Sequence, residues 1–195
     1  MNLRNPDAIP RELTFEDTLA GHAFTFCTTW GLFSPRGVDE GTRLLVRHLQ
    51  APADGTCLDL GCGWGPVGLV LSRLAPGGRV HLVDKDFVAV DYARRNAERN
   101  GCANCEVYLS NGFSCVAPEA RFDVVASNLP AKVGNELLTL MFSEARQRLR
   151  PGGRLYVVSV AGLKDYLRRT FRELFGNYTK VKQGRAHVVS MATVE

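Results

Sequence analysis

From residue 56 onwards, short apolar runs alternate with longer segments in which apolar residues recur every three or four positions. The short runs predict strands at 56–60, 79–84, 105–110, 122–128 and 154–160. The longer segments predict helices at 66–75, 87–101, 135–150 and 163–176. Strands that alternate with helices in this way predict a parallel sheet covered by helices on both faces.

The last part of the chain has a different pattern. Two strands are predicted at 178–182 and 185–194, and only a short turn at Gln183-Gly184 separates them. Such a turn leaves no room for a crossover helix, so these strands should form an antiparallel hairpin at one edge of the sheet. The predicted fold class is therefore α/β, with a doubly wound, mostly parallel sheet of seven strands.

The region before residue 56 alternates apolar and polar positions at 12–17 and 22–28, which predicts a small hairpin. A helix is predicted at 38–50. We expect one domain over residues 1–195, with a hairpin extension at 1–38 and a Rossmann-like core at 39–195. A chain of 195 residues is long enough to bury a sizeable core.

Composition narrows the class of protein only slightly. No apolar run approaches the roughly 18 to 20 residues that span a bilayer, and the first residues lack the apolar core of a signal peptide. We therefore expect a cytoplasmic protein with no membrane partner. The net charge of +4 is compatible with a nucleic-acid partner but is weak evidence for one.

The six cysteines include a single C-x-x-C pair, Cys102 and Cys105. A zinc site requires a second pair or nearby histidines, and the four histidines are scattered without ligand spacing. We expect reduced cysteines and no metal site.

A glycine-rich turn follows the first strand of the core, in the segment "LDLGCGWGPVG". Its residues are Gly61, Cys62, Gly63 and Gly65 around Trp64. Glycine allows positive φ and lets a ligand lie against the main chain, and ligands of doubly wound sheets bind at such strand ends. The pattern is G-x-G-x-G without a following G-K-[ST], so a Walker phosphate loop is excluded.

Two carboxylates accompany this turn. Asp84 ends the next strand, just over twenty residues past the glycines, where a carboxylate can accept hydrogen bonds from both hydroxyls of a ribose. Asp59 adds a negative charge that would repel a pyrophosphate and suit a cation. The alternative interpretation is a glycine turn needed only for packing, with Asp84 as a helix cap.

Together, "LDLGCGWG" and "HLVD" resemble the cofactor-binding motifs of class I S-adenosylmethionine-dependent methyltransferases. The segments "GLFSPRGVDEGTRLLVRHL", "LSNGFS" and "FDVVASNLP" are similar to the small methyltransferase domain of bacterial ribosomal RNA guanine-N2 methyltransferases and their single-domain relatives. The resemblance extends from about Phe24 to the end of the chain. It implies S-adenosyl-L-methionine as cofactor and S-adenosyl-L-homocysteine as product.

The resemblance also implies which residues meet the cofactor. The segment around Phe33 and the helix after it, with Asp39 and Thr42, would lie near it, and the turn at Asn111-Gly112 would contact the adenine. The expected cofactor-binding residues are Phe33, Thr42, Asp59, Gly61, Cys62, Gly63, Gly65, Asp84, Lys85, Asn111, Gly112, Phe113 and Asn128.

The expected catalytic residues are Asn128, Leu129 and Pro130. An asparagine oxygen and a backbone carbonyl can both accept hydrogen bonds from a planar amine and hold it in line with the methyl group. Proline fixes the backbone there. The family pattern is Asn-Pro-Pro-aromatic, so Leu129 and Ala131 depart from it. The missing aromatic would weaken base binding by about 1–3 kcal/mol, unless Trp30 or Phe33 replaces it.

The resemblance implies methylation of an exocyclic amine of a base in RNA, with ribosomal RNA as the expected partner. Arginine-rich segments at 146–154 and 168–172 are either RNA contacts or solvated helix faces. A small-molecule or protein methyltransferase, or a non-catalytic module that binds the cofactor, remain alternatives. The protein is expected to be a monomer or a homodimer.

Overall fold

A computed structural model describes residues 11–130 and 133–195. Its main sheet has seven strands in the order β5-β4-β3-β6-β7-β9-β8. The strands are β3 (Thr56–Leu60), β4 (Arg79–Asp84), β5 (Cys105–Leu109), β6 (Phe122–Asn128), β7 (Leu149–Val160), β8 (Thr179–Gln183) and β9 (His187–Thr193). Strands β3 to β7 pair in parallel, whereas β9 is antiparallel to both β7 and β8. The predicted sheet and its edge hairpin are confirmed.

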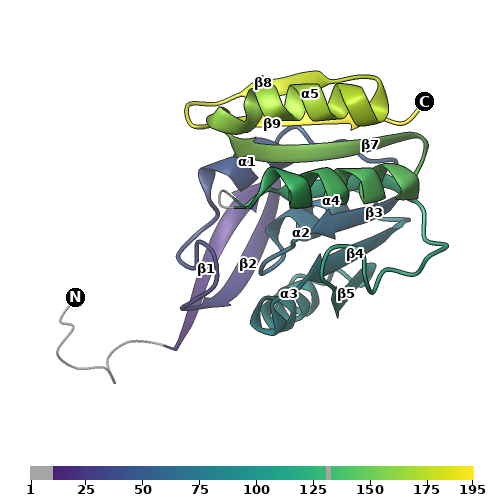
Figure 1. The fold of residues 1–195 in the computed structure, drawn as a ribbon. Coiled ribbons are helices and arrows are strands. Elements are labelled where there is room, and N and C mark those ends of the chain that lie inside the picture. Colours follow the sequence, from purple (N-terminus) through teal and green to yellow (C-terminus); the bar gives the residue numbers. More distant parts are fainter. Residues whose placement is uncertain (1–10, 131–132) are drawn as a thin grey trace.

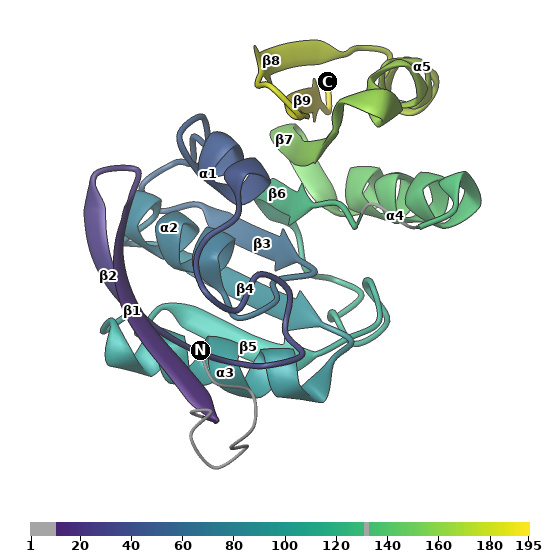
Figure 2. The same cartoon turned by 90° about the vertical axis from the view of Figure 1, so that its left-hand side faces the viewer.

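Helices cover both faces of this sheet (Figures 1 and 2). They are α1 (Glu40–Val46), α2 (Pro66–Leu74), α3 (Phe87–Arg99), α4 (Asn135–Arg148) and α5 (Lys164–Phe175). Helices α1, α2 and α3 share one hydrophobic core with the N-terminal hairpin, and α4 and α5 bury their apolar sides in a second core on the other face. No helix of the described residues is long and apolar enough to cross a membrane.

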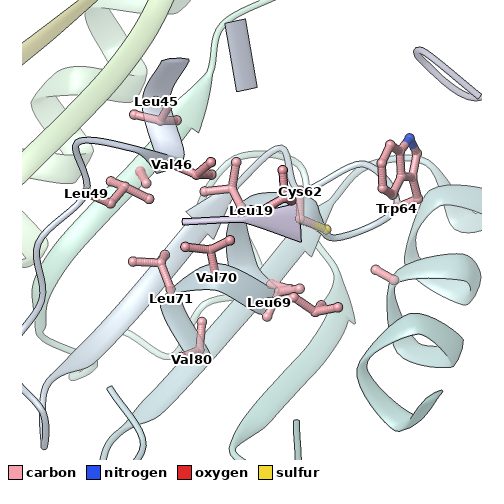
Figure 3. Close-up of a cluster of buried hydrophobic side chains, with 14 of the residues drawn as sticks. Leu19, Leu45, Val46, Leu49, Cys62, Trp64, Leu69, Val70, Leu71 and Val80 are labelled. Carbon is pink, nitrogen blue, oxygen red and sulfur yellow. The ribbon is translucent and has the colours of Figure 1, made fainter. Parts of the chain in front are cut away.

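The first core joins the hairpin to the glycine turn. Figure 3 shows Leu19 of the hairpin, Cys62 and Trp64 of the turn, and Val70 of α2 within one cluster of buried side chains. The indole ring of Trp64 meets the ring of Phe26 edge-on, with centroids 4.9 Å apart. The side chains of Cys62 and Trp64 therefore anchor the turn in the first core, and this packing fixes its main chain.

The N-terminal hairpin consists of β1 (Glu12–Leu19) and β2 (His22–Thr29), paired antiparallel as predicted. Two asparagine side chains, one in α3 and one at its C-terminal cap, satisfy the free edge of β2. The amide of Asn96, which is fully buried, accepts from the backbone N–H of Cys27 at 2.7 Å and donates to its carbonyl at 2.9 Å. Asn100 makes the same pair of bonds with Thr25. These contacts dock the hairpin against the core.

Most predicted boundaries differ from the structure by no more than two residues, but two are wrong by four or more. The helix predicted at 38–50 ends at Val46, because the chain tightens there into a turn in which the amide of His48 donates to the carbonyl of Leu45 at 2.9 Å. Strand β7 begins at Leu149 rather than at 154, because the Pro151-Gly152-Gly153 segment runs along the sheet and pairs with Val194.

Candidate cofactor and acceptor site

The glycines between β3 and α2 serve two different purposes. Gly61 and Gly63 have φ of +76° and +54°, and an added Cβ at either would meet no atom within 4 Å. Gly68, inside α2, is instead pressed against β4, since an added Cβ would lie 2.3 Å from the Cγ of Leu82. The turn therefore presents open main chain, as a bound ligand requires, whereas Gly68 serves packing.

The end of β4 holds this turn in place. Asp84 accepts a hydrogen bond from the amide of Gly63 at 2.9 Å through one carboxylate oxygen, and from the amide of Asp86 at 2.9 Å through the other. The amides of Gly61 and Cys62 both donate to the carbonyl of Val83. Asp84 is only partly buried, so its carboxylate lies beside open main chain with accepting capacity left over.

Asp59 occupies a more enclosed position beneath the turn. It is 1% exposed and accepts from the amide of Gly68 at 2.7 Å, in the first turn of α2. Burial raises the pKa of its carboxyl to about 7, against the hydrogen bond from Gly68, and the nearby charge of Asp84 raises it further. Burial likewise raises the pKa of the Cys62 thiol well above its ordinary value, so this thiol is not a nucleophile.

The side-chain amide of Asn128, at the end of β6, faces the start of α1. Its nitrogen donates to the hydroxyl of Thr42 at 2.9 Å and to the two carboxylate oxygens of Asp39 at 3.2 and 3.3 Å. Asp39 also caps α1, accepting from the amides of Gly41 and Thr42. Because a carboxylate only accepts, the amide nitrogen must face it, and the carbonyl oxygen of Asn128 points the other way. No group among residues 11–130 and 133–195 donates to that oxygen.

The two residues after Asn128 differ in exposure. Leu129 is 5% exposed, and its amide donates to the carbonyl of Val158 at 2.9 Å, which anchors the strand end. Pro130 is exposed. Within the described part of the chain, no hydrogen bond reaches the carbonyl of Leu129. Ala131, the departure from the aromatic of the family pattern, lies outside the described residues.

The connection between β2 and α1 reaches both halves of the site. At one end, the indole N–H of Trp64 in the glycine turn donates to the carbonyl of Phe33 at 2.9 Å. At the other end, Asp39 meets Asn128. Figure 2 shows this connection running from the hairpin to α1 beside the carboxyl ends of the central strands. The ring of Phe33 is 70% exposed, whereas Thr42 is buried.

The loop after β5 lies next to Asp84, since the amide of Ser110 donates to the carbonyl of Asp84 at 2.9 Å. Asn111 is exposed, and Gly112 has a φ of +61°. Phe113 is 2% exposed and packs in the second core with the guanidinium of Arg148 over its ring. Lys85 is exposed after the end of β4. The structure thus brings the expected residues together at the carboxyl ends of the parallel strands, where Phe113 lies beneath the surface.

The C-x-x-C pair lies at the opposite end of the sheet. Cys102 lies in the turn that leads into β5, and Cys105 is the first residue of that strand. The amide of Cys105 donates to the carbonyl of Cys102 at 3.1 Å. The interaction of the two thiols lowers the pKa of Cys102 and raises that of Cys105. In the described residues, no group of three or more candidate metal ligands is found.

Four contacts of the site were not predicted from the sequence. They are the bond from Trp64 to Phe33, the pairing of Asp39 with Asn128, and the bonds of Asn96 to Cys27 and to the carbonyl of Trp64. A buried polar residue on the apolar side of α3 was the one available signal for Asn96.

Several known proteins are similar to this chain in sequence and in fold. The family model described as methyltransferase small domain matches residues 23–190. The uncharacterized protein YbxB of Bacillus subtilis is 30% identical over 190 residues, which cover 96% of this chain and 94% of that protein. The ribosomal RNA large subunit methyltransferase G of Klebsiella pneumoniae is 33% identical over 195 residues, which cover 96% of this chain and 51% of that protein.

Among solved structures, a 16S rRNA N2 methyltransferase of T. thermophilus in complex with AdoMet and guanosine superposes with a TM-score of 0.85 and 27% identity. The match covers 97% of this chain and 52% of that one. The chain thus spans about half the length of the ribosomal RNA methyltransferases that it matches. It belongs to the methyltransferase small domain family, and its fold is that of the S-adenosylmethionine-dependent methyltransferases.

Proposed function

We propose that this protein transfers a methyl group from S-adenosylmethionine to an exocyclic amine of a base in RNA. The observation that carries the proposal is the orientation of Asn128, whose amide nitrogen is held by Asp39 and Thr42. Its carbonyl oxygen is thereby left to accept from a substrate, at the end of the strand next to β3 and its glycine turn.

The residues present fit the cofactor. Gly61 and Gly63 leave space for a ligand against the main chain, because a Cβ at either would meet nothing within 4 Å. The carboxylate of Asp84 beside them would accept hydrogen bonds from a ribose. Buried Asp59 would favour a cation over a phosphate. Asn111 and Gly112, whose loop is tied to Asp84, would border the adenine.

The chemistry requires alignment more than a strong base. When bound, the cofactor supplies an electrophilic methyl group. The Asn128 oxygen and the Leu129 carbonyl would accept the two N–H bonds of a planar amine and hold its nitrogen in line. These acceptors would also stabilise the positive charge that develops on the amine nitrogen as it bonds to the methyl group. One N–H proton then passes to solvent.

RNA is the favoured acceptor because two of the three similar proteins named above are ribosomal RNA methyltransferases, and because the chain carries a net charge of +4. Such an acceptor would be met in the cytoplasm. In its more specific form, the proposal names ribosomal RNA as the substrate and guanine as the target base.

The decisive experiment follows radiolabelled methyl groups from S-adenosylmethionine into the RNA, protein and metabolite fractions of a cell extract. We expect label in RNA with the wild-type protein and none above background with Asn128→Ala. Calorimetry should show nearly unchanged cofactor affinity in that variant. Label confined to protein or to metabolites would contradict the RNA substrate, and loss of cofactor affinity in Asn128→Ala would contradict the role given to Asn128.

A further inference from the structure

The connection between β2 and α1 holds an aromatic side chain out in solvent. The ring of Phe33 is 70% exposed and that of Trp30 is 37% exposed, although most large apolar residues of the described chain are buried. We refer to residues 30–36 as the aromatic loop. Exposure alone does not distinguish Phe33, since Phe87 is 73% exposed, so what sets Phe33 apart is where the aromatic loop lies and how it is held.

The aromatic loop is firmly built. The indole of Trp64 donates to the carbonyl of Phe33 at 2.9 Å, and the hydroxyl of Ser34 donates to the carbonyl of Gly37 at 2.7 Å. The hydroxyl of Thr28 donates to the carbonyl of Pro35. Ser34 takes a φ of +48°, in the left-handed region that disfavours a side chain. Such a conformation persists only where its surroundings enforce it, so the ring of Phe33 is presented by a fixed backbone.

The loop also lies where an acceptor would enter. Phe33 rests on the glycine turn through Trp64, and the same connection continues to Asp39, which orients Asn128. The exposed ring therefore lies on a connection that is fixed at one end to the glycine turn and at the other end to Asn128. After Asn128 the sequence continues with Leu129, Pro130 and Ala131, so that strand end supplies no aromatic ring of its own.

The chemistry of the loop suits a nucleotide. The guanidinium of Arg36 lies 4.9 Å from the centroid of the Trp30 ring, and Arg36 is exposed. No carboxylate of residues 11–130 or 133–195 forms an ion pair with Arg36. The exposed ring of Phe33 and the guanidinium of Arg36 in the same loop match a nucleic acid, because a base can stack on the ring while a phosphate meets the cation.

We propose that the aromatic loop is the base-stacking surface of the substrate site, with a base of single-stranded RNA lying against Phe33 and a phosphate meeting Arg36. This inference rests on the proposed function and deepens it. It assigns Phe33 to the RNA rather than to the cofactor.

The test measures fluorescence anisotropy with two labelled probes, a guanosine-containing single-stranded RNA octamer and an abasic ribose-phosphate octamer of equal length. We expect Phe33→Ala to weaken binding of the RNA octamer about tenfold and to leave the abasic octamer unaffected. Phe33→Tyr, which keeps a ring, should bind the RNA octamer as the wild type does. Phe87→Ala is the matched control, because Phe87 is 73% exposed and outside the aromatic loop.

Three results would overturn the stacking role. They are unchanged RNA affinity in Phe33→Ala, equal losses for both octamers, and an equal loss in Phe87→Ala. Calorimetry adds a fourth, because Phe33→Ala should bind S-adenosylmethionine within about twofold of the wild type. A large loss of cofactor affinity would mean that Phe33 covers the cofactor instead.

The two proposals fail separately. If the wild type labels RNA while Phe33→Ala binds the octamer normally, the stacking role is wrong and the RNA methyltransferase stands. If the wild type transfers label only to protein or metabolites, the RNA function fails and the stacking role fails with it.

Discussion

The carboxylate of Asp39 and the amide of Asn128 meet at 3.2 and 3.3 Å, although they lie 89 positions apart in the chain. Asp39 caps α1, and Asn128 ends β6. One carboxylate therefore both caps a helix and sets which atom of the asparagine side chain points away from α1.

This relationship predicts the effect of Asp39→Asn. Asparagine caps a helix as well as aspartate does, so the free energy of unfolding should change little. An amide can also turn its NH2 toward Asn128, which removes the constraint on the orientation of Asn128. We expect the single-turnover methylation rate to fall about tenfold to a hundredfold at saturating cofactor. A wild-type rate in a stably folded Asp39→Asn protein would contradict the positioning role.

Removing the carboxylate of Asp84 should weaken cofactor binding. It accepts from the amide of Gly63 and lies beside the open turn, so Asp84→Ala loses both loop support and a charged acceptor. We expect the cofactor Kd to rise about 10- to 100-fold, measured by calorimetry. Asp54→Ala is the control, since Asp54 is exposed and lies just before the first residue of β3, at the other end of that strand from the glycine turn. Equal affinity in both variants would argue against a ribose contact.

Alanine substitutions should separate the two kinds of glycine. Gly68→Ala places a Cβ 2.3 Å from Leu82 and should destabilise the protein by about 1–3 kcal/mol in urea denaturation. Its cofactor Kd should change little, and Leu82→Ala should partly relieve the clash. Gly63→Ala meets no atom but has a φ of +54°, so it should cost about 1–2 kcal/mol and raise the cofactor Kd. The reverse pattern would mean that the turn serves packing alone.

The buried carboxyl of Asp59 predicts a pH dependence of stability. Its pKa is about 7 in the folded protein, because burial disfavours the charge, and about 4 in an unfolded chain. Between these pH values the folded state binds more protons, so this group lowers the free energy of unfolding as the pH rises from 4 to 7.

Asp59→Asn removes that titration and keeps an acceptor for the amide of Gly68. We expect the variant to match the wild type near pH 4 and to exceed its stability by up to about 4 kcal/mol at pH 8, in urea denaturation followed across this range. A stability difference that stays constant with pH would show that Asp59 titrates normally.

Much of this protein could be read along the chain. Apolar periodicity located the strands of the sheet, because side chains of buried parallel strands and amphipathic helices repeat at different intervals. The glycines at 61, 63 and 65 and the acid at 84 lie within and after such elements, so their meeting at one edge of the sheet followed from the topology of parallel strands. The boundaries at Val46 and Leu149 were missed, because local turns and a strand extended through Pro151 depend on tertiary neighbours.

Other features depended on the folded arrangement. Three contacts join residues that are far apart in the chain. Asp39 meets Asn128 across 89 positions, Trp64 meets Phe33 across 31, and Asn96 meets Cys27 across 69. From residue type alone, Asp39 could be only a helix cap, Trp64 only a core aromatic residue, and Asn96 only a solvated amide on a helix. Which polar groups satisfy one another is decided only when packing removes water from around them, since each buried donor must then find the acceptor that the fold brings to it.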